Sequence, residues 1–271
     1  MDKFKEYLKI TYGEKNGTAN SYFKAIEILD KIFKQYDVFN YNGNSIVNII
    51  DVGELISLYE FVKMEEKKMK DEKDSIFKFG QTKQQSYPRK GFCSAAVRSL
   101  INYKELIIQQ QATECIKLQD TSSKLVKKLN TIITISNTEA NAEVRQRIGQ
   151  NIFRSILIEI YQGQCCVTGL NIKEILRASH ILPWSENTHN RLNPENGLLL
   201  SATYDAAFDK YLFSFDDDYR MVVSPYIRHF YTNEAAKECF EKFEGKQLIL
   251  PYKFSPNKNF LEEHRAKLIG M

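Results

Sequence analysis

The feature that most constrains the fold is a branched aliphatic residue at every fourth position from Val144 to Ile160. A spacing of four residues places these side chains on one face of a helix. Ser136 and Glu139 have the spacing of a capping box, which predicts the start of the helix, and Gly163 predicts its end. The chain therefore has a long amphipathic helix near its middle, and the sequence on either side of this helix differs in character.

The residues before this helix predict a mainly helical domain over residues 1–135. Thr18 to Ser21 supply N-cap candidates for the first clear amphipathic pattern. A second pattern loses its apolar stripe in KMEEKKMKDEKD, which predicts a solvated helix end or a linker. Apolar residues at helical spacing predict helices over residues 18–36, 52–64, 94–118 and 124–129.

The residues after Gly163 alternate short apolar runs with turn residues, as small β-strands do. The runs include CCVTG, SHILPW and NPENGLLLS. Further along, YLFSF and RMVVS flank an Asp-Asp-Asp-Tyr turn, which predicts a β-hairpin. The second half is therefore predicted to be a small α+β unit, and the fold class of the whole chain is α+β.

Several classes of protein are disfavoured by the sequence. The opening MDKFKEYLKI lacks the apolar core of a signal peptide, and no apolar run is long enough to span a bilayer. The five cysteines include no CxxC pair, which fits a reducing compartment and offers no zinc-knuckle spacing. We therefore expect a cytoplasmic protein that makes no membrane contact.

The basic excess of the chain lies in its first half, although the formal net charge is only +4. Between Lys78 and Lys104 there are six basic residues, no acidic ones, and several interleaved aromatic residues. Cations neutralise phosphates and aromatic rings pack on bases, so the stretch fits a nucleic-acid contact surface. An ordinary basic loop ahead of a helix is the alternative interpretation. The candidate DNA-binding residues here are Lys83, Arg89, Lys90 and Arg98.

One of the four histidines, His180, lies in a compact cluster of acid-base and metal-binding groups. Asn196 follows in the turn-forming Asn-Pro-Glu-Asn-Gly, and Asp205 and Asp209 have the spacing that puts two carboxylates on one helix face. An imidazole that accepts a proton and a divalent ion that neutralises phosphate charge are the parts of metal-assisted phosphodiester hydrolysis. The alternative is a structural histidine, with a helix cap and a surface acid.

Several blocks occur together in an order that resembles a known family. Between Arg147 and Pro225 the sequence contains GQNIFR, CCVTGL, RASHILPW, NPENGLLLS and DAAFDKYLFSFDDD, and FLEEHRAKL follows from Phe260 to Leu268. This region resembles the HNH (ββα-metal) domain of bacterial restriction-type endonucleases. The resemblance implies a C-terminal nuclease domain, which we place at residues 136–271 together with its linking helix.

The resemblance also implies roles for single residues. His180 would be the general base that activates water, and Asn196 would brace the loop that carries it and hold the imidazole in orientation. Asp205 and Asp209 would bind one divalent metal ion, Mg²⁺ or Mn²⁺.

Two positions depart from the simplest pattern of the family. Ser179 stands where many members carry a metal-binding Asp or His, and Tyr204 stands where some carry the third-letter His, which leaves the full ligand set open. Arg177 and Arg191 flank the strand of the catalytic histidine. They are candidates for DNA phosphate contacts, with surface solubility as the alternative. Trp184 is expected to pack under the loop.

These observations predict a restriction-type endonuclease that cuts foreign double-stranded DNA, with the helical domain as the recognition domain. A homodimer would supply one site for each strand. One alternative is a weakly specific defence nuclease gated by a signal or a partner, in which the helical domain is a sensor. Another is a non-catalytic DNA-binding protein on an HNH scaffold, although His180, Asn196, Asp205 and Asp209 are all retained.

Overall fold

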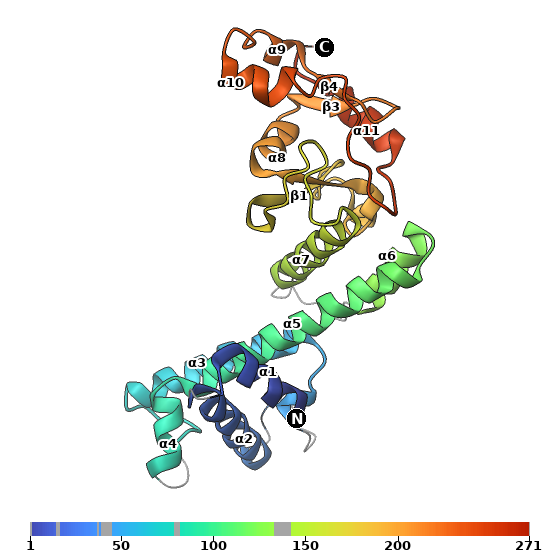
Figure 1. Ribbon diagram of the computed structural model, residues 1–271. Coiled ribbons are helices and arrows are strands. Elements are labelled where there is room, and N and C mark those ends of the chain that lie inside the picture. The colour runs from blue at the N-terminus through green and yellow to red at the C-terminus, as the bar shows by residue number, and fades with distance from the viewer. Residues whose placement is uncertain are drawn as a thin grey trace. The chain divides into compact units, whose positions relative to one another are not determined.

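The computed structural model of the chain describes residues 2–14, 17–36, 38, 45–78, 82–132 and 142–270. Within these residues, helices extend to Ile160, and two short β-hairpins with further helices follow (Figure 1). The predicted α+β fold class is confirmed. None of the helices in the described ranges is long and apolar enough to cross a membrane.

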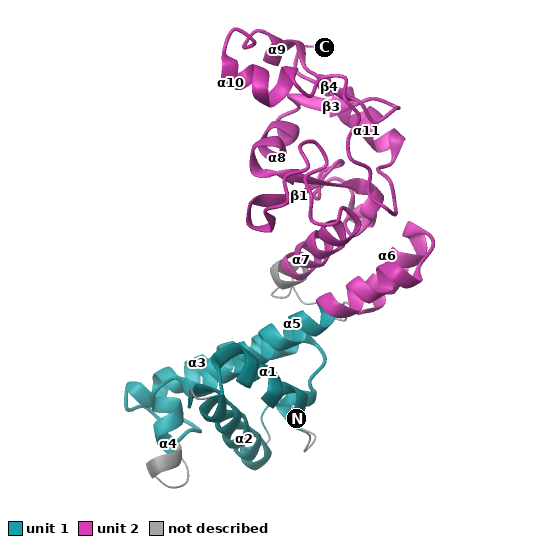
Figure 2. Cartoon of the chain, viewed as in Figure 1, with its two compact units in different colours: residues 1–108, 134–145 teal, residues 109–133, 146–271 magenta. Residues whose placement is uncertain are grey.

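The chain divides into two compact units (Figure 2). Unit 1 consists of residues 1–108 and 134–145, and unit 2 consists of residues 109–133 and 146–271. The predicted domain boundary at residue 135 and the predicted capping box lie outside the described residues, so both stay predictions.

Unit 1 is built from amphipathic helices that bury their apolar faces. The predicted helix over residues 18–36 is confirmed, and the helix predicted from residue 94 begins two residues earlier, at Phe92. Buried side chains such as Phe4, Ile32 and Val97 form the core of this unit. The elements are α1 (Asp2–Tyr12), α2 (Thr18–Tyr36), the 3₁₀ helix η2 (Ile46–Asn48), α3 (Val52–Lys70), α4 (Thr82–Arg89) and the first part of α5 (Phe92–Leu118).

The end of α3 confirms the prediction of a solvated helix end at most positions, and it differs at a few buried side chains. The charged segment continues the helix, and Glu65 and Glu66 are only 3% and 4% exposed. The Glu66 carboxylate accepts hydrogen bonds from the backbone N and the Oγ of Ser94, at 3.0 and 2.6 Å, and so caps the first turn of α5. Burial raises the pKa of Glu66. The glutamates are buried because they bind backbone and hydroxyl donors that are far away in the sequence.

Unit 2 is organised around a ββα module. Strand β1 (Leu176–His180) pairs antiparallel with β2 (Gly197–Ser201), and His180 lies opposite Gly197. Helix α8 (Ala202–Asp209) follows β2 directly and packs against both strands. Every residue of β2 is buried. The module therefore places the end of β1 and the face of α8 close together.

Helix α7 (Ala142–Ile160) is the predicted central helix. Its residues from 146 onward belong to unit 2 and pack against this module. A Cβ atom on Gly197 would lie 2.7 Å from Cζ of Phe153 and 2.8 Å from Cδ1 of Leu157. A Cβ atom on Gly149 would lie 3.0 Å from the ring of Trp184. Both glycines permit a close approach that a side chain would block. The helix is thus part of the module as well as a connector.

The remaining elements complete unit 2. The predicted hairpin is confirmed as β3 (Phe213–Phe215) paired with β4 (Met221–Val223). Lys253 Nζ donates to the backbone oxygen of Ile116 at 2.9 Å, which ties the end of α5 to the C-terminal region. The other elements are α6 (Ser122–Ile132), η4 (Lys173–Ile175), η5 (Thr188–Asn190), η6 (Pro194–Asn196), α9 (Pro225–Arg228), α10 (Glu234–Ala236), the π-helix η7 (Lys237–Glu241) and α11 (Lys258–Arg265).

Candidate active site

A pocket of about 360 Å³ lies where β1, α8 and the loop after β1 meet. It brings together three of the predicted site residues, His180, Asp205 and Asp209. Asn196, the fourth residue of the predicted set, is not among the residues that line it. The lining residues are Ala178, Ser179, His180, Ile181, Pro183, Trp184, Asp205, Asp209, Tyr211 and His264.

His180 is the last residue of β1, and its ring is held by aromatic contacts and one hydrogen bond. The ring stacks on Phe153 at 3.8 Å between centroids, and Trp184 meets it edge-on at 5.2 Å. Nε2 lies 3.0 Å from the backbone oxygen of Arg191. Because a carbonyl oxygen only accepts, Nε2 carries the hydrogen, and Nδ1 is the basic nitrogen of the neutral ring. Burial lowers the pKa of His180, which favours that neutral form.

Asp205 and Asp209 lie one turn apart on α8 and line the same pocket. Burial, and then the negative charge of Asp205, raise the pKa of Asp209. The hydroxyl of Ser179 donates a hydrogen bond to Oδ1 of Asp205. Asp205 is half-buried and Asp209 is exposed. The two carboxylates repel each other, and a bound cation would reduce that repulsion.

The donor set determines which metal could be held here. No group of three or more His, Cys, Asp or Glu side chains suited to a metal occurs in the part of the chain that the structure describes. The pocket offers two carboxylates, and Mg²⁺ usually binds through one or two carboxylates, with waters and substrate phosphate oxygens as its other ligands. Asp205 and Asp209 thus fit a hard divalent ion whose remaining ligands come from water and substrate.

Asn196 does not line the pocket and is 1% exposed. Its Oδ1 accepts from the backbone N of Leu182 at 2.8 Å, and its Nδ2 donates to the backbone oxygens of Leu182 and Asn190 at 3.2 and 3.4 Å. Its own carbonyl accepts from the backbone N of Ile181 at 3.0 Å. Asn196 therefore ties together both ends of the loop after His180, and these hydrogen bonds go to the loop and not to the imidazole.

Of the two predicted arginines of this region, Arg177 lies on β1 and Arg191 lies in the loop that follows it. Arg191 donates its Nε to the backbone oxygen of Trp184 at 3.0 Å, and its guanidinium lies 5.1 Å from the centroid of that ring. Arg177 is exposed on β1 and donates to the backbone oxygens of Glu174 and Leu176. Arg191 thus contacts His180 through its backbone carbonyl and Trp184 through its side chain.

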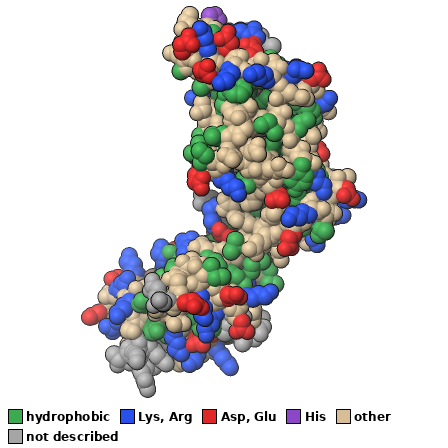
Figure 3. Space-filling model, in the orientation of Figure 1, with side chains coloured by type: hydrophobic (Ala, Val, Ile, Leu, Met, Phe, Trp, Pro, Cys, Tyr) green, Lys and Arg blue, Asp and Glu red, His purple; other side chains and the backbone are tan. Residues whose placement is uncertain are grey.

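The predicted DNA-binding residues of the first half belong to unit 1. The side chain of Lys83 lies outside the described residues, while Arg89 and Lys90 are exposed at the end of α4. Arg98 is exposed on α5, with its guanidinium 4.2 Å from the ring centroid of Tyr59. Acidic and basic side chains are intermixed on the visible face of the molecule (Figure 3).

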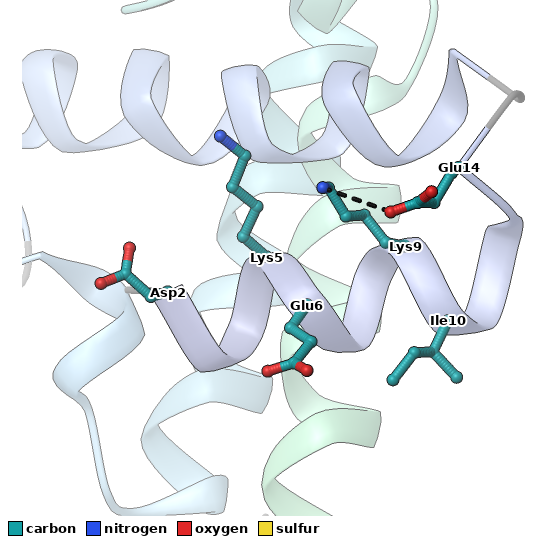
Figure 4. Close-up of a pocket in the computed structure, with 6 residues that line it drawn as sticks. All are labelled: Asp2, Lys5, Glu6, Lys9, Ile10 and Glu14. Carbon is teal, nitrogen blue, oxygen red and sulfur yellow. Dashed lines mark hydrogen bonds and ion pairs between the residues drawn. The ribbon is translucent and has the colours of Figure 1, made fainter.

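A second pocket lies beside α1 in unit 1 (Figure 4). Lys9 pairs there with Glu14 at 3.5 Å, and Lys5 lies over the ring of Phe23 at 5.0 Å. The lining contains both acidic and basic side chains and no histidine. It therefore lacks the combination of a histidine with two neighbouring carboxylates that the ββα module has. Its lining residues are Asp2, Lys5, Glu6, Lys9, Ile10 and Glu14.

His264 on α11 is a pocket residue that the sequence analysis did not identify. It is 3% exposed, and its ring stacks on Phe208 at 3.7 Å. Nε2 donates to the backbone oxygen of Phe208 at 3.1 Å, and Nδ1 therefore accepts from Oγ of Ser214 at 3.0 Å. Burial lowers the pKa of His264 to about 4. The ring therefore holds the last turn of α8 next to Asp209. The sequence feature that could have identified His264 is its position in the block FLEEHRAKL.

Residues 165–216 match the model of a protein family described as HNH endonuclease. No curated protein matches the chain. The matched span contains β1, β2, α8 and β3, and with them His180, Asn196, Asp205 and Asp209. This chain therefore carries an HNH endonuclease domain at residues 165–216. The match supports a nuclease that acts on nucleic acid, and it does not distinguish a restriction type.

Proposed function

We propose that this chain is a metal-dependent DNA endonuclease in which His180 is the general base. The observation that carries the proposal is the contact of 3.0 Å between His180 Nε2 and the backbone oxygen of Arg191, which indicates the tautomer of the ring. Because Nε2 donates to the Arg191 carbonyl, the basic nitrogen of the neutral ring is Nδ1. No described residue bonds Nδ1, so it can accept a proton from a water molecule in the pocket of Asp205 and Asp209.

The reaction would be in-line attack of water on a phosphodiester. His180 Nδ1 takes a proton from the water, whose oxygen bonds to phosphorus as the bond to the 3′ oxygen breaks. The 3′ oxygen then takes up a proton, which leaves a 3′-hydroxyl and a 5′-phosphate. Asp205 and Asp209 would hold a divalent ion, which would supply positive charge to the phosphate and to the departing oxygen.

Other residues of the site would position these groups. The Phe153 stack and the Arg191 carbonyl restrict the imidazole, so little motion is needed to bring Nδ1 to the water. Asn196 fixes the loop whose first residues follow His180 directly. Ser179 orients the Asp205 carboxylate.

The finer proposal is a restriction-type enzyme that acts on foreign double-stranded DNA. Unit 1 is a separate compact body, with Arg89, Lys90 and Arg98 exposed, which supports a role in DNA recognition. Cleavage of both strands would use a homodimer or two successive binding events.

The test is incubation of the purified protein with unmodified and cytosine-modified phage DNA in Mg²⁺, Mn²⁺ or EDTA, followed by gel analysis and end sequencing. The matched variants are His180→Gln and, as a control, His229→Gln at an exposed histidine outside the pocket. We expect discrete fragments with 5′-phosphate ends from the unaltered protein and from the control, only with metal.

A smear of fragments would keep the nuclease and reject the restriction type in favour of a weakly specific or gated enzyme. DNA binding without cleavage under every condition would reject the enzymatic proposal. Equal cleavage by His180→Gln and the control would remove His180 from its role.

A further inference from the structure

Two arginines converge at the start of β1. Arg154, on α7, donates Nη1 to the backbone oxygen of Leu176 at 2.6 Å and Nη2 to that of Lys173 at 2.7 Å. Arg177 donates Nη1 to the same Leu176 oxygen at 2.9 Å and to the backbone oxygen of Glu174 at 3.1 Å. The two guanidinium groups therefore share one carbonyl oxygen and are held side by side.

This pair of like charges has no acidic partner in the part of the chain that the structure describes. Burial, and then the positive charge of Arg177, lower the pKa of Arg154. A guanidinium has about five N–H donors, and the carbonyl oxygens use only part of each set. The pair thus combines uncompensated positive charge with unused donors, which suits a phosphate that bridges the two groups.

The pair lies close to the candidate active site along β1. Arg177 and Ser179 are two residues apart, so their side chains leave the strand on the same face. The Ser179 hydroxyl bonds Asp205, one of the candidate metal ligands. Two strand residues span about 7 Å, which is about two base steps along the DNA axis at roughly 3.4 Å each.

We infer that Arg154 and Arg177 together bind one phosphate of the DNA backbone, one or two nucleotides from the bond that is cut. The inference rests on the proposed function, because it takes the cleaved phosphate to lie at Asp205 and Asp209. The contact holds the strand in register on the ββα module and reads no base. Arg154, which sequence patterns place only on the central helix, becomes a DNA-binding residue.

The experiment compares the unaltered protein with Arg177→Gln and with Arg154→Lys, which keeps the charge and limits the risk of misfolding. Arg220→Gln is the matched control, because Arg220 lies in the same unit and also donates to a backbone oxygen, that of Gly245. Binding of a fluorescent duplex is measured by anisotropy in EDTA at a series of salt concentrations. Circular dichroism checks that each variant is folded.

We expect Arg177→Gln to weaken duplex binding about tenfold at moderate salt and to reduce the slope of log K against log salt by about 1, as expected for one lost phosphate contact. Arg154→Lys should weaken binding to a smaller extent and keep most of the slope, because an ammonium group contacts phosphate without the bidentate fork. Arg220→Gln should match the unaltered protein.

A second measurement separates this inference from the proposed function. Bis(p-nitrophenyl) phosphate is a phosphodiester without a neighbouring phosphate, so Arg177→Gln should lose more kcat/KM on DNA than on this compound, by about tenfold. An unchanged salt slope in folded Arg177→Gln, or equal losses on both substrates, would overturn the inference. Absence of cleavage by the unaltered protein would reject the proposed function, while the salt slope in EDTA would still decide the role of the arginines.

Discussion

The surroundings of His180 and His264 are nearly the same, and the two residues differ mainly at one nitrogen. Each ring stacks on a phenylalanine, Phe153 or Phe208, and each donates Nε2 to a backbone oxygen. Nδ1 of His264 accepts from the Ser214 hydroxyl, whereas no described residue bonds Nδ1 of His180. Burial lowers the pKa of both rings, so burial alone does not identify the base. The free nitrogen distinguishes them.

The largest effect is expected from His180→Gln. Loss of a general base slows a reaction by about 10²–10⁴-fold, and we expect that loss in the initial rate of DNA cleavage with Mg²⁺. His264→Gln can still donate to the Phe208 oxygen, so its initial rate of cleavage should fall by less than about tenfold. Both variants are assayed at a low temperature at which they are folded. Equal losses in the two folded variants would break the comparison.

The second expected difference is in stability. His264→Ala removes a buried ring and leaves the Ser214 hydroxyl and the Phe208 oxygen without their partner, which should cost about 3 kcal/mol of unfolding free energy. His180→Ala should cost less, because His180 is only half-buried and makes one hydrogen bond. Urea unfolding followed by circular dichroism measures both values, and the reverse order would show that the structural role belongs to His180.

Acid should weaken the fold through the same two rings. At pH above about 7.5 both rings are almost entirely neutral in the folded and unfolded chain, so they add little pH dependence. As the pH falls from about 6.5 to 4, the unfolded chain binds a proton that His264, with its pKa of about 4, does not bind. The unfolding free energy should then fall by about 2–4 kcal/mol.

His264→Gln should flatten most of this pH dependence, and the lowered pKa of His180 should account for a remaining part in the same direction. Urea unfolding at pH 7.5, 6.0 and 5.0 gives the slopes. An unaltered slope in His264→Gln would show that other groups cause the acid sensitivity.

The smallest effect concerns two serines that each bond a pocket residue, Ser179 with Asp205 and Ser214 with His264. Ser179→Ala removes a hydrogen bond to Asp205, worth about 1 kcal/mol, so the Mn²⁺ concentration for half-maximal cleavage should rise about fivefold. Ser214→Ala removes the hydroxyl that bonds His264 and should reduce stability without changing the metal requirement. If only Ser214→Ala changed the metal requirement, the bond between Ser214 and His264 would affect metal binding and the bond between Ser179 and Asp205 would not.

Local patterns predicted much of the fold because helices and hairpins depend on neighbours in sequence. Helical spacing predicted α2, α5, α6 and α7, and strand runs around an acidic turn predicted β3 and β4. The grouping of His180 with Asp205 and Asp209 was also expected. A helix that directly follows the second strand of a hairpin packs against the first strand, which ends at His180. The roles of these three residues stay proposals.

What the sequence did not reveal depends on partners far away in the chain. Glu66 is buried because it bonds Ser94, 28 residues later, and a pattern of charges predicts the opposite. Phe153 and His264 belong to the site because α7 and α11 pack against the ββα module, which helical spacing does not indicate. Arg154 and Arg177 become neighbours in the same way.

The His264 contact also sets an order of events during protein synthesis. The histidine follows the residue that it holds, Phe208, by 56 positions. At a synthesis rate of about 5–20 residues per second, the growing chain contains His180, Asp205 and Asp209 for several seconds before His264 exists. A nascent chain on the ribosome therefore lacks the ring that secures the last turn of α8, and the pocket is completed only after the segment with His264 has been added.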